Sequence, residues 1–319
     1  MSAQEMVRQF AIALDNNDFE AAGVHLAQGC RYDSPRGVLV GRDAVLGSYA
    51  AAAGSKRDVV DRVVNRSNVV ERGENRFAIG YTDRVHAGRL VHTYRCEQHI
   101  VVCDGQVNSV THVEIDGERP ALEAFFSRIS KRVVVVVYPG CVLYEVMLAV
   151  ELIGEHVRIE MISPEGEPVT LATGFTVGAD ASFAGAPRAN VVGVLIPGGD
   201  PGDLIGNTKM STWLRQTYEA GASVGAICAG PLLLGEAGLL RGRKFTHGYG
   251  SMYADKLAPF WAGAQYVDAA IVQDGRLLTA QPQAHVAFGV RFAERLGLLD
   301  TNSAARALAF YRGESKSRR

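Results

Sequence analysis

The run of residues that most constrains the fold is Val133–Val137, five consecutive valines that follow Lys131 and Arg132. A strand made only of β-branched apolar residues has to be covered on both faces, which is typical of a parallel sheet with helices on each side. Two more apolar strands are expected, at Val191–Ile196 and around Val224. Helical patterns separate these strands, so this part of the chain is predicted to be an α/β domain with a doubly wound parallel sheet.

The segment Ala222–Leu234 carries the residue of this sheet that is best suited to chemistry. A short apolar strand runs into small residues and then into a helix, with Cys228 at the turn. Small neighbours leave room for the strained backbone of a nucleophile elbow, and the N-terminus of a helix favours a thiolate. The same small residues would also let a helix pack closely on a sheet, so a buried structural cysteine is the alternative.

Other segments follow strands at the edge formed by the carboxyl ends of the sheet, where Cys228 is also expected. Ligands of doubly wound sheets bind just outside that edge. Gly198 and Gly199 would let the main chain approach an oxyanion closely, with a simple turn as the alternative. Glu145 follows the valine strand and would support a thiolate when its carboxyl is protonated. His247 follows a later strand and is a candidate proton shuttle. The alternatives are an exposed helix residue for Glu145 and a structural role for His247.

The first part of the chain has a different organisation. Residues 4–27 have the pattern of two short amphipathic helices, and a third helix is expected from Gly41. Long strands are expected between about residues 57 and 115, with an Asp-Gly hairpin turn at Cys103–Gly105. A last helix is expected at Pro120–Ile129. Helices followed by a long meander predict an α+β cone, in which a curved antiparallel sheet wraps around helices.

The pattern changes at Ser130–Arg132, so we expect two domains, residues 1–128 and residues 129–319. The net charge is −1 and the only basic run is the tail Lys316–Arg319, which argues against nucleic acid and anionic membranes as partners. Five scattered cysteines without a C-x-x-C motif argue against a disulfide framework or a structural zinc site. No apolar run has the length of a membrane span. We therefore expect a cytoplasmic protein without a metal or cofactor.

The order of elements over residues 1–128 resembles the SnoaL-like superfamily, whose fold is also that of nuclear transport factor two. This resemblance implies an apolar pocket with a few polar residues at the mouth of the cone, and dimers formed through the open face of the sheet. The alternative is that the polar residues are interior hydrogen-bonded groups or face solvent. The pocket candidates are Tyr32, Asp33, Tyr81, His92, Tyr94 and His112.

The C-terminal part, from Lys131 to about Leu298, resembles the ThiJ/PfpI superfamily, and most closely its parkinsonism-associated deglycase branch. The resemblance implies a flavodoxin-like fold related to class I glutamine amidotransferases, generally a homodimer. It also implies that Cys228 is the nucleophile, Glu145 the protonated glutamate and His247 the histidine. Backbone N–H groups near Gly199 and Ala229 would form the oxyanion site. The matching motifs are the valine strand with Glu145, Leu195–Asp200, Ala226–Pro231, Thr246–His247 and Asp274–Thr279.

The chain also departs from the patterns of this superfamily. Residues 280–285 replace its usual Gly-Pro-Gly-Thr-Ser and place His285 as a basic rim residue. Isonitrile hydratases of the superfamily carry an aspartate at the position of Glu145 and a threonine at that of Ala229, so their reaction is a weaker expectation. The late His-x-Glu of amidotransferases is missing, and the residues after Leu299 are too few for a helix-turn-helix domain.

The favoured hypothesis is a cysteine-dependent enzyme, glyoxalase-like or deglycase-like, that acts as a hydrolase or lyase on a small electrophilic carbonyl compound. The N-terminal domain would supply an accessory pocket or a dimer interface. One alternative is a redox or ligand sensor in which Cys228 is oxidised to a sulfinate that Glu145 stabilises. Another is a hydratase-like lyase that uses the cone to collect its substrate.

Overall fold

The computed structural model describes residues 1–54, 60–88 and 90–314, and the chain divides into two compact units. The first unit comprises Met1–Ile129 and the second Ser130–Arg319. Each unit has its own hydrophobic core. Among the described residues, no helix has the length and apolar character needed to cross a lipid bilayer.

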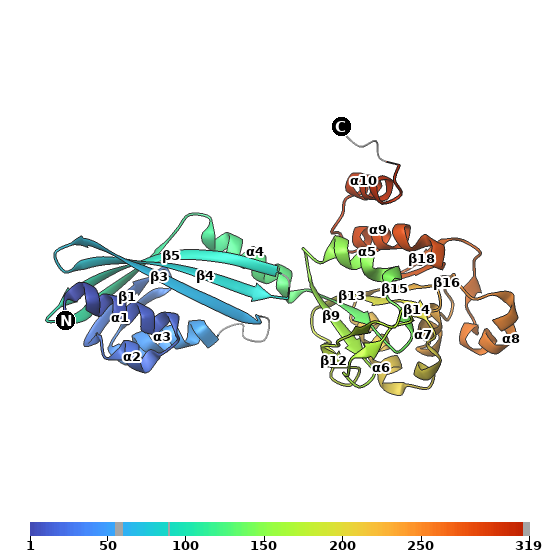
Figure 1. Ribbon diagram of the computed structural model, residues 1–319, viewed down its shortest axis with the longest axis horizontal. Coiled ribbons are helices and arrows are strands. Elements are labelled where there is room, and N and C mark those ends of the chain that lie inside the picture. The colour runs from blue at the N-terminus through green and yellow to red at the C-terminus, as the bar shows by residue number, and fades with distance from the viewer. Residues whose placement is uncertain (55–59, 89, 315–319) are drawn as a thin grey trace. The chain divides into compact units, whose positions relative to one another are not determined.

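The first unit is a six-stranded sheet with helices α1, α2 and α3 on one face (Figure 1). The strand order is β2-β1-β6-β5-β4-β3, and every neighbouring pair is antiparallel except β1 and β6. The elements are α1 (Ala3–Asp15), α2 (Phe19–Gly23), β1 (Leu26–Ser34), β2 (Gly37–Val40), α3 (Arg42–Gly54), β3 (Arg62–Gly73), β4 (Arg76–Ala87), β5 (Leu90–Cys103), β6 (Gln106–Glu114) and α4 (Glu118–Ser130).

Local sequence accounts for the boundaries of these elements. The side chain of Ser2 caps α1 by accepting a hydrogen bond from the N–H of Glu5, and α1 then buries the stripe that includes Phe10 and Leu14 against the sheet. The turn between β5 and β6 places Asp104 and Gly105 at φ 48° and 70°. Asp-Gly accepts these left-handed conformations readily, so the predicted hairpin turn forms here.

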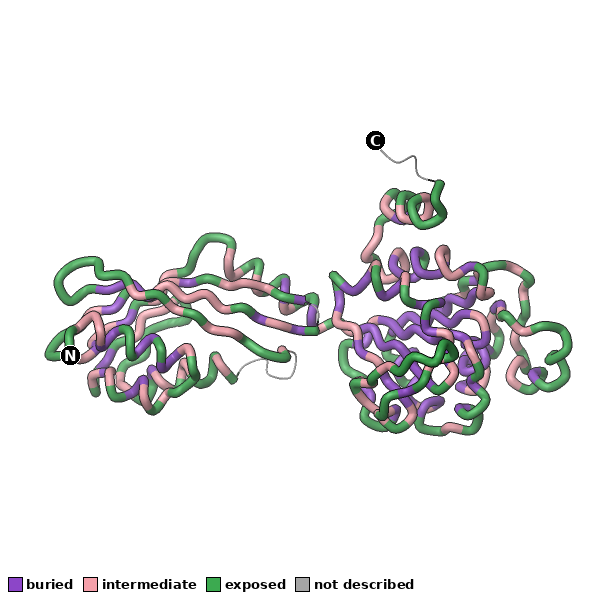
Figure 2. The backbone as a smooth tube through the Cα atoms, viewed as in Figure 1, coloured by how far each residue is buried: buried purple, intermediate pink, exposed green. Residues whose placement is uncertain are grey.

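The second unit is built on a seven-stranded sheet in the order β12-β9-β7-β13-β15-β19-β18. All neighbouring pairs are parallel except β18 and β19, so the predicted parallel α/β sheet is confirmed. Figure 2 shows that buried residues are concentrated in its strands. The strands are β7 (Arg132–Val136), β9 (Arg158–Ser163), β12 (Ala181–Ser182), β13 (Val191–Ile196), β15 (Ser223–Ile227), β18 (Ile271–Asp274) and β19 (Leu277–Ala280).

The helices cover both faces of this sheet, with α5 and α9 side by side on one of them (Figure 1). Close approach of α9 depends on glycine, because a Cβ at Gly225 on β15 would lie 2.8 Å from the ring of Phe288. The helices are α5 (Tyr144–Ile153), α6 (Thr208–Glu219), α7 (Pro231–Glu236), α8 (Ala254–Leu257), α9 (His285–Arg295) and α10 (Thr301–Tyr311). Short strands are β8 (Cys141–Val142), β10 (Val169–Thr170), β11 (Thr176–Val177), β14 (Gly198–Gly199), β16 (Lys244–Phe245) and β17 (Gln265–Tyr266).

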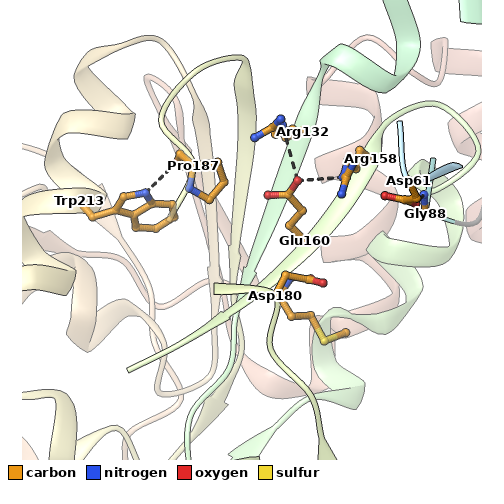
Figure 3. A network of polar contacts seen from close by, with 9 residues as sticks. Asp61, Gly88, Arg132, Arg158, Glu160, Asp180, Pro187 and Trp213 are labelled. Atoms are coloured by element: carbon orange, nitrogen blue, oxygen red, sulfur yellow. Dashed lines mark hydrogen bonds and ion pairs between the residues drawn. The ribbon is translucent and has the colours of Figure 1, made fainter. Parts of the chain in front are cut away.

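A buried carboxylate lies at the N-terminal side of the valine strand (Figure 3). Glu160 on β9 is only 8% exposed, and its Oε1 lies 2.9 Å from Nε of Arg158 and 3.6 Å from Nε of Arg132 on β7. A buried charge is costly unless it is paired, so the two guanidinium groups neutralise this carboxylate. The arrangement explains why arginine immediately precedes the valine run.

Candidate active site

Cys228 lies on the turn that links β15 to α7, at the carboxyl edge of the parallel sheet. Its φ is 61°, in the left-handed region that costs a residue other than glycine about 1–3 kcal/mol. Two backbone hydrogen bonds hold this conformation. The N–H of Cys228 donates to the carbonyl of Ala280 at 2.9 Å, and its carbonyl accepts from the N–H of Gly248 at 2.7 Å. The small neighbouring residues therefore form the strained turn that the sequence predicts.

Glu145 faces the sulfur from the first turn of α5. Its side chain is buried, and its Oε2 accepts a 2.7 Å hydrogen bond from the N–H of Gly198. A hydrogen bond also joins its carboxyl to the thiol of Cys228. A Cβ at Gly198 would lie 2.5 Å from Cβ of Cys228, 2.6 Å from Oε2 of Glu145 and 2.8 Å from Sγ. The carboxyl and the sulfur thus meet over a position that only glycine fits.

The electrostatics of Glu145 and Cys228 favour a single negative charge shared between the carboxyl and the thiol. Burial raises the pKa of Glu145, whereas the N–H of Gly198, the thiol of Cys228 and the charge of His285 lower it. Burial also raises the pKa of Cys228 to about 12, and the Glu145 carboxylate adds to this rise. When Glu145 carries the proton, that contribution disappears. The thiolate is therefore favoured only while Glu145 is protonated.

The helix that follows Cys228, α7, comprises Pro231–Glu236. Two backbone N–H donors, those of Ala229 and Gly199, lower the pKa of Cys228. Ala229 lies just before α7, where N–H donors are expected to have this effect. Burial and the Glu145 carboxylate raise the same pKa, and burial is the largest of these effects.

The loop after β13 supplies fewer oxyanion donors than the sequence suggests. The N–H of Gly198 is already used by Glu145, which leaves the N–H groups of Gly199 and Ala229 near the sulfur. Gly199 has φ 115°, and a Cβ there would lie 2.3 Å from the carbonyl oxygen of Gly140. Pairing of β14 with β8 fixes this approach. Two of the three predicted backbone groups therefore remain available to an oxyanion.

Tyr138 is a structural contributor that the sequence analysis missed. It follows the valine strand, its side chain is buried, and its hydroxyl donates to the carbonyls of Pro197 at 2.9 Å and Gly198 at 2.8 Å. Burial raises the pKa of this phenol well above its usual value, so it stays a donor. A polar aromatic residue directly after a fully apolar strand is the signal that would have indicated it.

His247 does not join the thiol among the described hydrogen bonds. Its Nδ1 accepts from the N–H of Tyr249 at 3.1 Å, and its ring stacks on Trp261 with 5.2 Å between centroids. Burial lowers the pKa of His247, which favours the neutral imidazole. The structure brings the next residue, Gly248, to the elbow, but it places the imidazole of His247 in an aromatic cluster with Trp261 and Tyr266.

Two other titratable side chains lie near the pair. His285 is the first residue of α9, and its ring meets that of Tyr144 edge to face, with 5.6 Å between centroids. Its charge acts on Glu145. Tyr249, which the sequence analysis missed, interacts electrostatically with Cys228, and burial raises the pKa of Tyr249 to about 12. The predicted rim residue His285 therefore contacts Tyr144, and its charge acts on Glu145.

In the first unit, the register of the sheet separates Asp33 from the other predicted pocket residues. Tyr32, Tyr81, Tyr94 and His112 share one face with Gln98, because their strand partners and two-residue spacings match. Asp33 is adjacent to Tyr32 and so points to the other face, where it pairs with Arg31 at 3.2 Å. His92 lies on the same face as Tyr94, two residues earlier in β5, where its ring stacks on Phe125 of α4 with 5.3 Å between centroids.

The shared face carries buried polar atoms without a partner. The hydroxyl of Tyr81 and both ring nitrogens of His112 are buried and make no hydrogen bond among the described residues. Tyr49 lies beside them and donates to Gln98 Oε1 at 2.8 Å. Burial and the charge of Asp15 raise the pKa of Asp83 to about 6. A buried polar atom without a partner is costly, so this face is suited to a small polar ligand.

The described residues contain no group of three or more His, Cys, Asp or Glu side chains that could hold a metal ion. All five cysteines are free thiols, and Cys103 is the exposed one among them.

The second unit is similar in sequence to several known proteins. The sequence profile of the DJ-1/PfpI family matches residues 131–295. A deglycase of Pyrococcus horikoshii is 31% identical over 128 residues, which are 40% of this chain and 75% of that protein. An isonitrile hydratase of Pseudomonas putida is 30% identical over 147 residues, 46% of this chain and 62% of that protein.

The solved structures add a likeness of fold. A DJ-1 superfamily protein of Agrobacterium tumefaciens aligns with a TM-score of 0.52 at 23% identity. The alignment covers 58% of this chain and 100% of that chain. A ThiJ/PfpI family protein of Pseudomonas syringae aligns with a TM-score of 0.50 at 25% identity, over 60% of this chain and 78% of that one.

Proposed function

This chain belongs to the DJ-1/PfpI family, and we propose that it is a cysteine-dependent enzyme that acts on a small electrophilic carbonyl compound. One observation carries the proposal. Cys228 is held at φ 61° with its sulfur between the Glu145 carboxyl and the N–H groups of Gly199 and Ala229. A nucleophile, an acid and oxyanion donors are the groups that addition to a carbonyl requires. The similarity to a protein named as a deglycase supports the same class of substrate.

The first chemical step follows from the protonation of the pair. In the reactive state Glu145 holds the proton and Cys228 is a thiolate. The sulfur adds to the carbonyl carbon, an S–C bond forms, and the π electrons move to the oxygen. The N–H groups of Gly199 and Ala229 stabilise that oxyanion, and the Glu145 proton passes to it to give a neutral hemithioacetal.

The test is turnover of methylglyoxal by the wild type, Cys228→Ser and Glu145→Gln. Cys103→Ser is the matched control, because it removes an exposed thiol outside the site. We expect Cys228→Ser to lose at least about a hundredfold in kcat/KM, the scale of losing a nucleophile, and Cys103→Ser to match the wild type. Wild-type turnover by Cys228→Ser would refute the proposal.

A hydratase reaction is the second candidate, because a relative named as an isonitrile hydratase is 30% identical over 147 residues. The same variants assayed with an isonitrile, with formation of the N-substituted formamide as readout, separate the two substrates. A sensor role is less favoured. Burial and the Glu145 carboxylate raise the pKa of Cys228 to about 12, and peroxide attacks thiolates. Peroxide oxidation of Cys228 well before Cys103 would favour the sensor instead.

For the first unit, we propose an accessory binding role on the face that carries Tyr81 and His112. Their buried atoms without partners support it. If this face holds part of the substrate, Tyr81→Phe with His112→Asn raises KM and leaves kcat unchanged, the sign of lost uniform binding. An unchanged KM argues against the role. We also propose a homodimer, which light scattering of the full chain tests.

A further inference from the structure

We propose that the first unit binds a small primary amine, in its protonated form, between the carboxylates of Asp15 and Asp83 and the hydroxyl of Tyr81. This site deepens the accessory binding role proposed for the face that carries Tyr81, because it gives the ligand a chemical class. It rests on that role, but it does not depend on the use of Cys228 as a nucleophile.

Asp15 is the last residue of α1, and two hydrogen bonds hold it over β3. Its Oδ2 accepts from the hydroxyl of Ser67 at 2.7 Å, and its backbone carbonyl accepts from the side-chain amide of Asn65 at 3.1 Å. Its Oδ1 is buried and has no hydrogen-bond partner among the described residues. One buried acceptor of this carboxylate is therefore unused.

The register of the sheet brings Tyr81 and Asp83 to the same place. Ser67 on β3 lies opposite Tyr81 on β4. Asn65 lies opposite Asp83 in the same pair of strands. Residues directly opposite each other on antiparallel strands share a face, with Cβ atoms about 4.5–5.5 Å apart. The two residues that hold Asp15 are thus the cross-strand neighbours of Tyr81 and Asp83, so the two carboxyl groups and the phenol lie together.

The carboxylates of Asp15 and Asp83 are not balanced by a cation within the described ranges. The groups that shift their pKa values include neither lysine nor arginine. Arg119, whose charge acts on tyrosines of this face, is bonded to Glu114. The hydroxyl of Tyr81 is buried and also makes no hydrogen bond in the described part of the chain. Uncompensated charges and unpaired polar atoms are costly in a protein interior, so these groups are suited to a ligand that pairs with them.

A primary ammonium group matches this arrangement, because it carries three N–H donors and no acceptor. Asp15 Oδ1, the carboxylate of Asp83 and the lone pairs of Tyr81 Oη supply three acceptors. Tyr94 lies opposite Asp83 on β5, so an aromatic side chain borders the positive charge. Among the described residues, these two acids belong to no group of three or more His, Cys, Asp or Glu that could hold a metal ion. An ammonium group therefore fits this set of acceptors better than a metal ion does.

A small molecule can reach this site. The side chains of Asp15, Tyr81, Asp83 and Tyr94 are all partly exposed, although helices cover this face of the sheet. Asp15 Oδ1 and the Tyr81 hydroxyl are themselves buried, which favours a small ligand over a macromolecule. Burial and the charge of Asp15 raise the pKa of Asp83 to about 6, so Asp83 is ionised at pH 8. A cation bound between the two carboxylates reduces their repulsion.

The test is isothermal titration calorimetry of the full chain at pH 8 with benzylamine. Benzyl alcohol is the neutral counterpart, since it has the same ring and a similar length but no charge. We expect benzylamine to bind at least roughly tenfold more tightly than benzyl alcohol, the scale of a hydrogen bond to a charged group. A titration that shows no binding of benzylamine at millimolar concentration, or binding no tighter than that of the alcohol, would overturn the proposal.

Substitutions locate the binding. Asp83→Asn keeps the shape of the side chain and removes its charge, so we expect it to weaken benzylamine binding roughly tenfold to a hundredfold. Asp15→Asn should weaken it in the same way. Asp33→Asn is the matched control, because Asp33 lies on the other face of the sheet and pairs with Arg31. An equal loss in Asp33→Asn would contradict the site.

Tyr81→Phe provides a second measurement if a substitution of either acid does not fold, because it removes only the hydroxyl. We expect it to weaken benzylamine binding several-fold and to leave the weak binding of benzyl alcohol less affected. Benzylamine binding that neither Asp83→Asn nor Tyr81→Phe weakens would place the amine elsewhere and refute the proposal.

The outcome is separate from that of the proposed function. Cys228→Ser should bind benzylamine as the wild type does. Specific binding of benzylamine by a chain that turns over no carbonyl compound would refute the enzyme and leave the amine site intact. A higher KM for Tyr81→Phe with His112→Asn, without any binding of benzylamine, would keep the accessory role and refute an amine as its ligand.

Discussion

Replacing Gly198 by alanine tests the geometry of the site most directly. The added Cβ would lie 2.5 Å from Cβ of Cys228, 2.6 Å from Oε2 of Glu145 and 2.8 Å from Sγ. All three distances are well below van der Waals contact, so the loop or both side chains have to move. Movement of the loop also breaks the 2.7 Å hydrogen bond from the N–H of Gly198 to Glu145.

The expected cost follows from these two effects. Overpacking a close-packed interior costs about 1–3 kcal/mol, and a hydrogen bond to a charged group contributes about 1.5–3 kcal/mol. Because the effects are not additive, we expect Gly198→Ala to lower the free energy of unfolding by about 2–4 kcal/mol. For a domain of this size, that corresponds to a Tm lower by about 4–16 °C.

The assay is thermal unfolding of Gly198→Ala beside Gly178→Ala, followed by the alkylation rate of Cys228. Gly178 lies in the same unit, and a Cβ there meets nothing within 4 Å, so it is the matched control. We expect the control to unfold and react as the wild type does. If Gly198→Ala also keeps the wild-type Tm and alkylation rate, the crowding of Cys228 and Glu145 at this glycine is refuted.

Three further substitutions test the remaining interactions. Glu145→Gln removes the carboxylate that raises the pKa of Cys228. Alkylation of Cys228 by iodoacetamide at pH 7 should therefore become several-fold faster, while turnover of the carbonyl compound falls. Slower alkylation would contradict a proton shared between Glu145 and Cys228. Tyr138→Phe leaves the carbonyls of Pro197 and Gly198 without their donor. We expect the free energy of unfolding in denaturant to fall by about 1–3 kcal/mol. An unchanged unfolding midpoint would contradict this role of Tyr138. In the first unit, the folded-state pKa of Asp83 is raised from 3.8 to about 6. The folded state then binds more protons than the unfolded state between these values, so stability falls as pH rises through about 4–6. Asp83→Asn should remove this loss and stabilise the unit at pH 7 by roughly 2 kcal/mol, allowing for partial exposure of the side chain. Parallel pH profiles for wild type and variant would show that Asp83 is not the cause.

The sequence alone predicts the features that depend on near neighbours in the chain. Five consecutive valines can be buried only in a strand covered on both faces, and Val133–Val136 are buried in β7. Small residues around Cys228 permit the left-handed turn at φ 61°. In the first unit, alternation places Tyr94 and Gln98 on one face of β5. These results follow from local sterics and period, which a sequence contains.

The tertiary structure alone decides which distant groups act on one another. The sequence makes His247 the candidate proton shuttle and His285 a rim residue, yet it is the charge of His285 that acts on Glu145, while the ring of His247 packs in an aromatic cluster. The sequence makes Gly198 a candidate oxyanion donor, but in the folded chain its N–H donates to Glu145 instead. The pKa of the Cys228 thiol likewise depends on how deeply the fold buries it and on a carboxylate from another element. Burial and Coulomb energies depend on distances in space, and those are fixed only once helices and strands pack together.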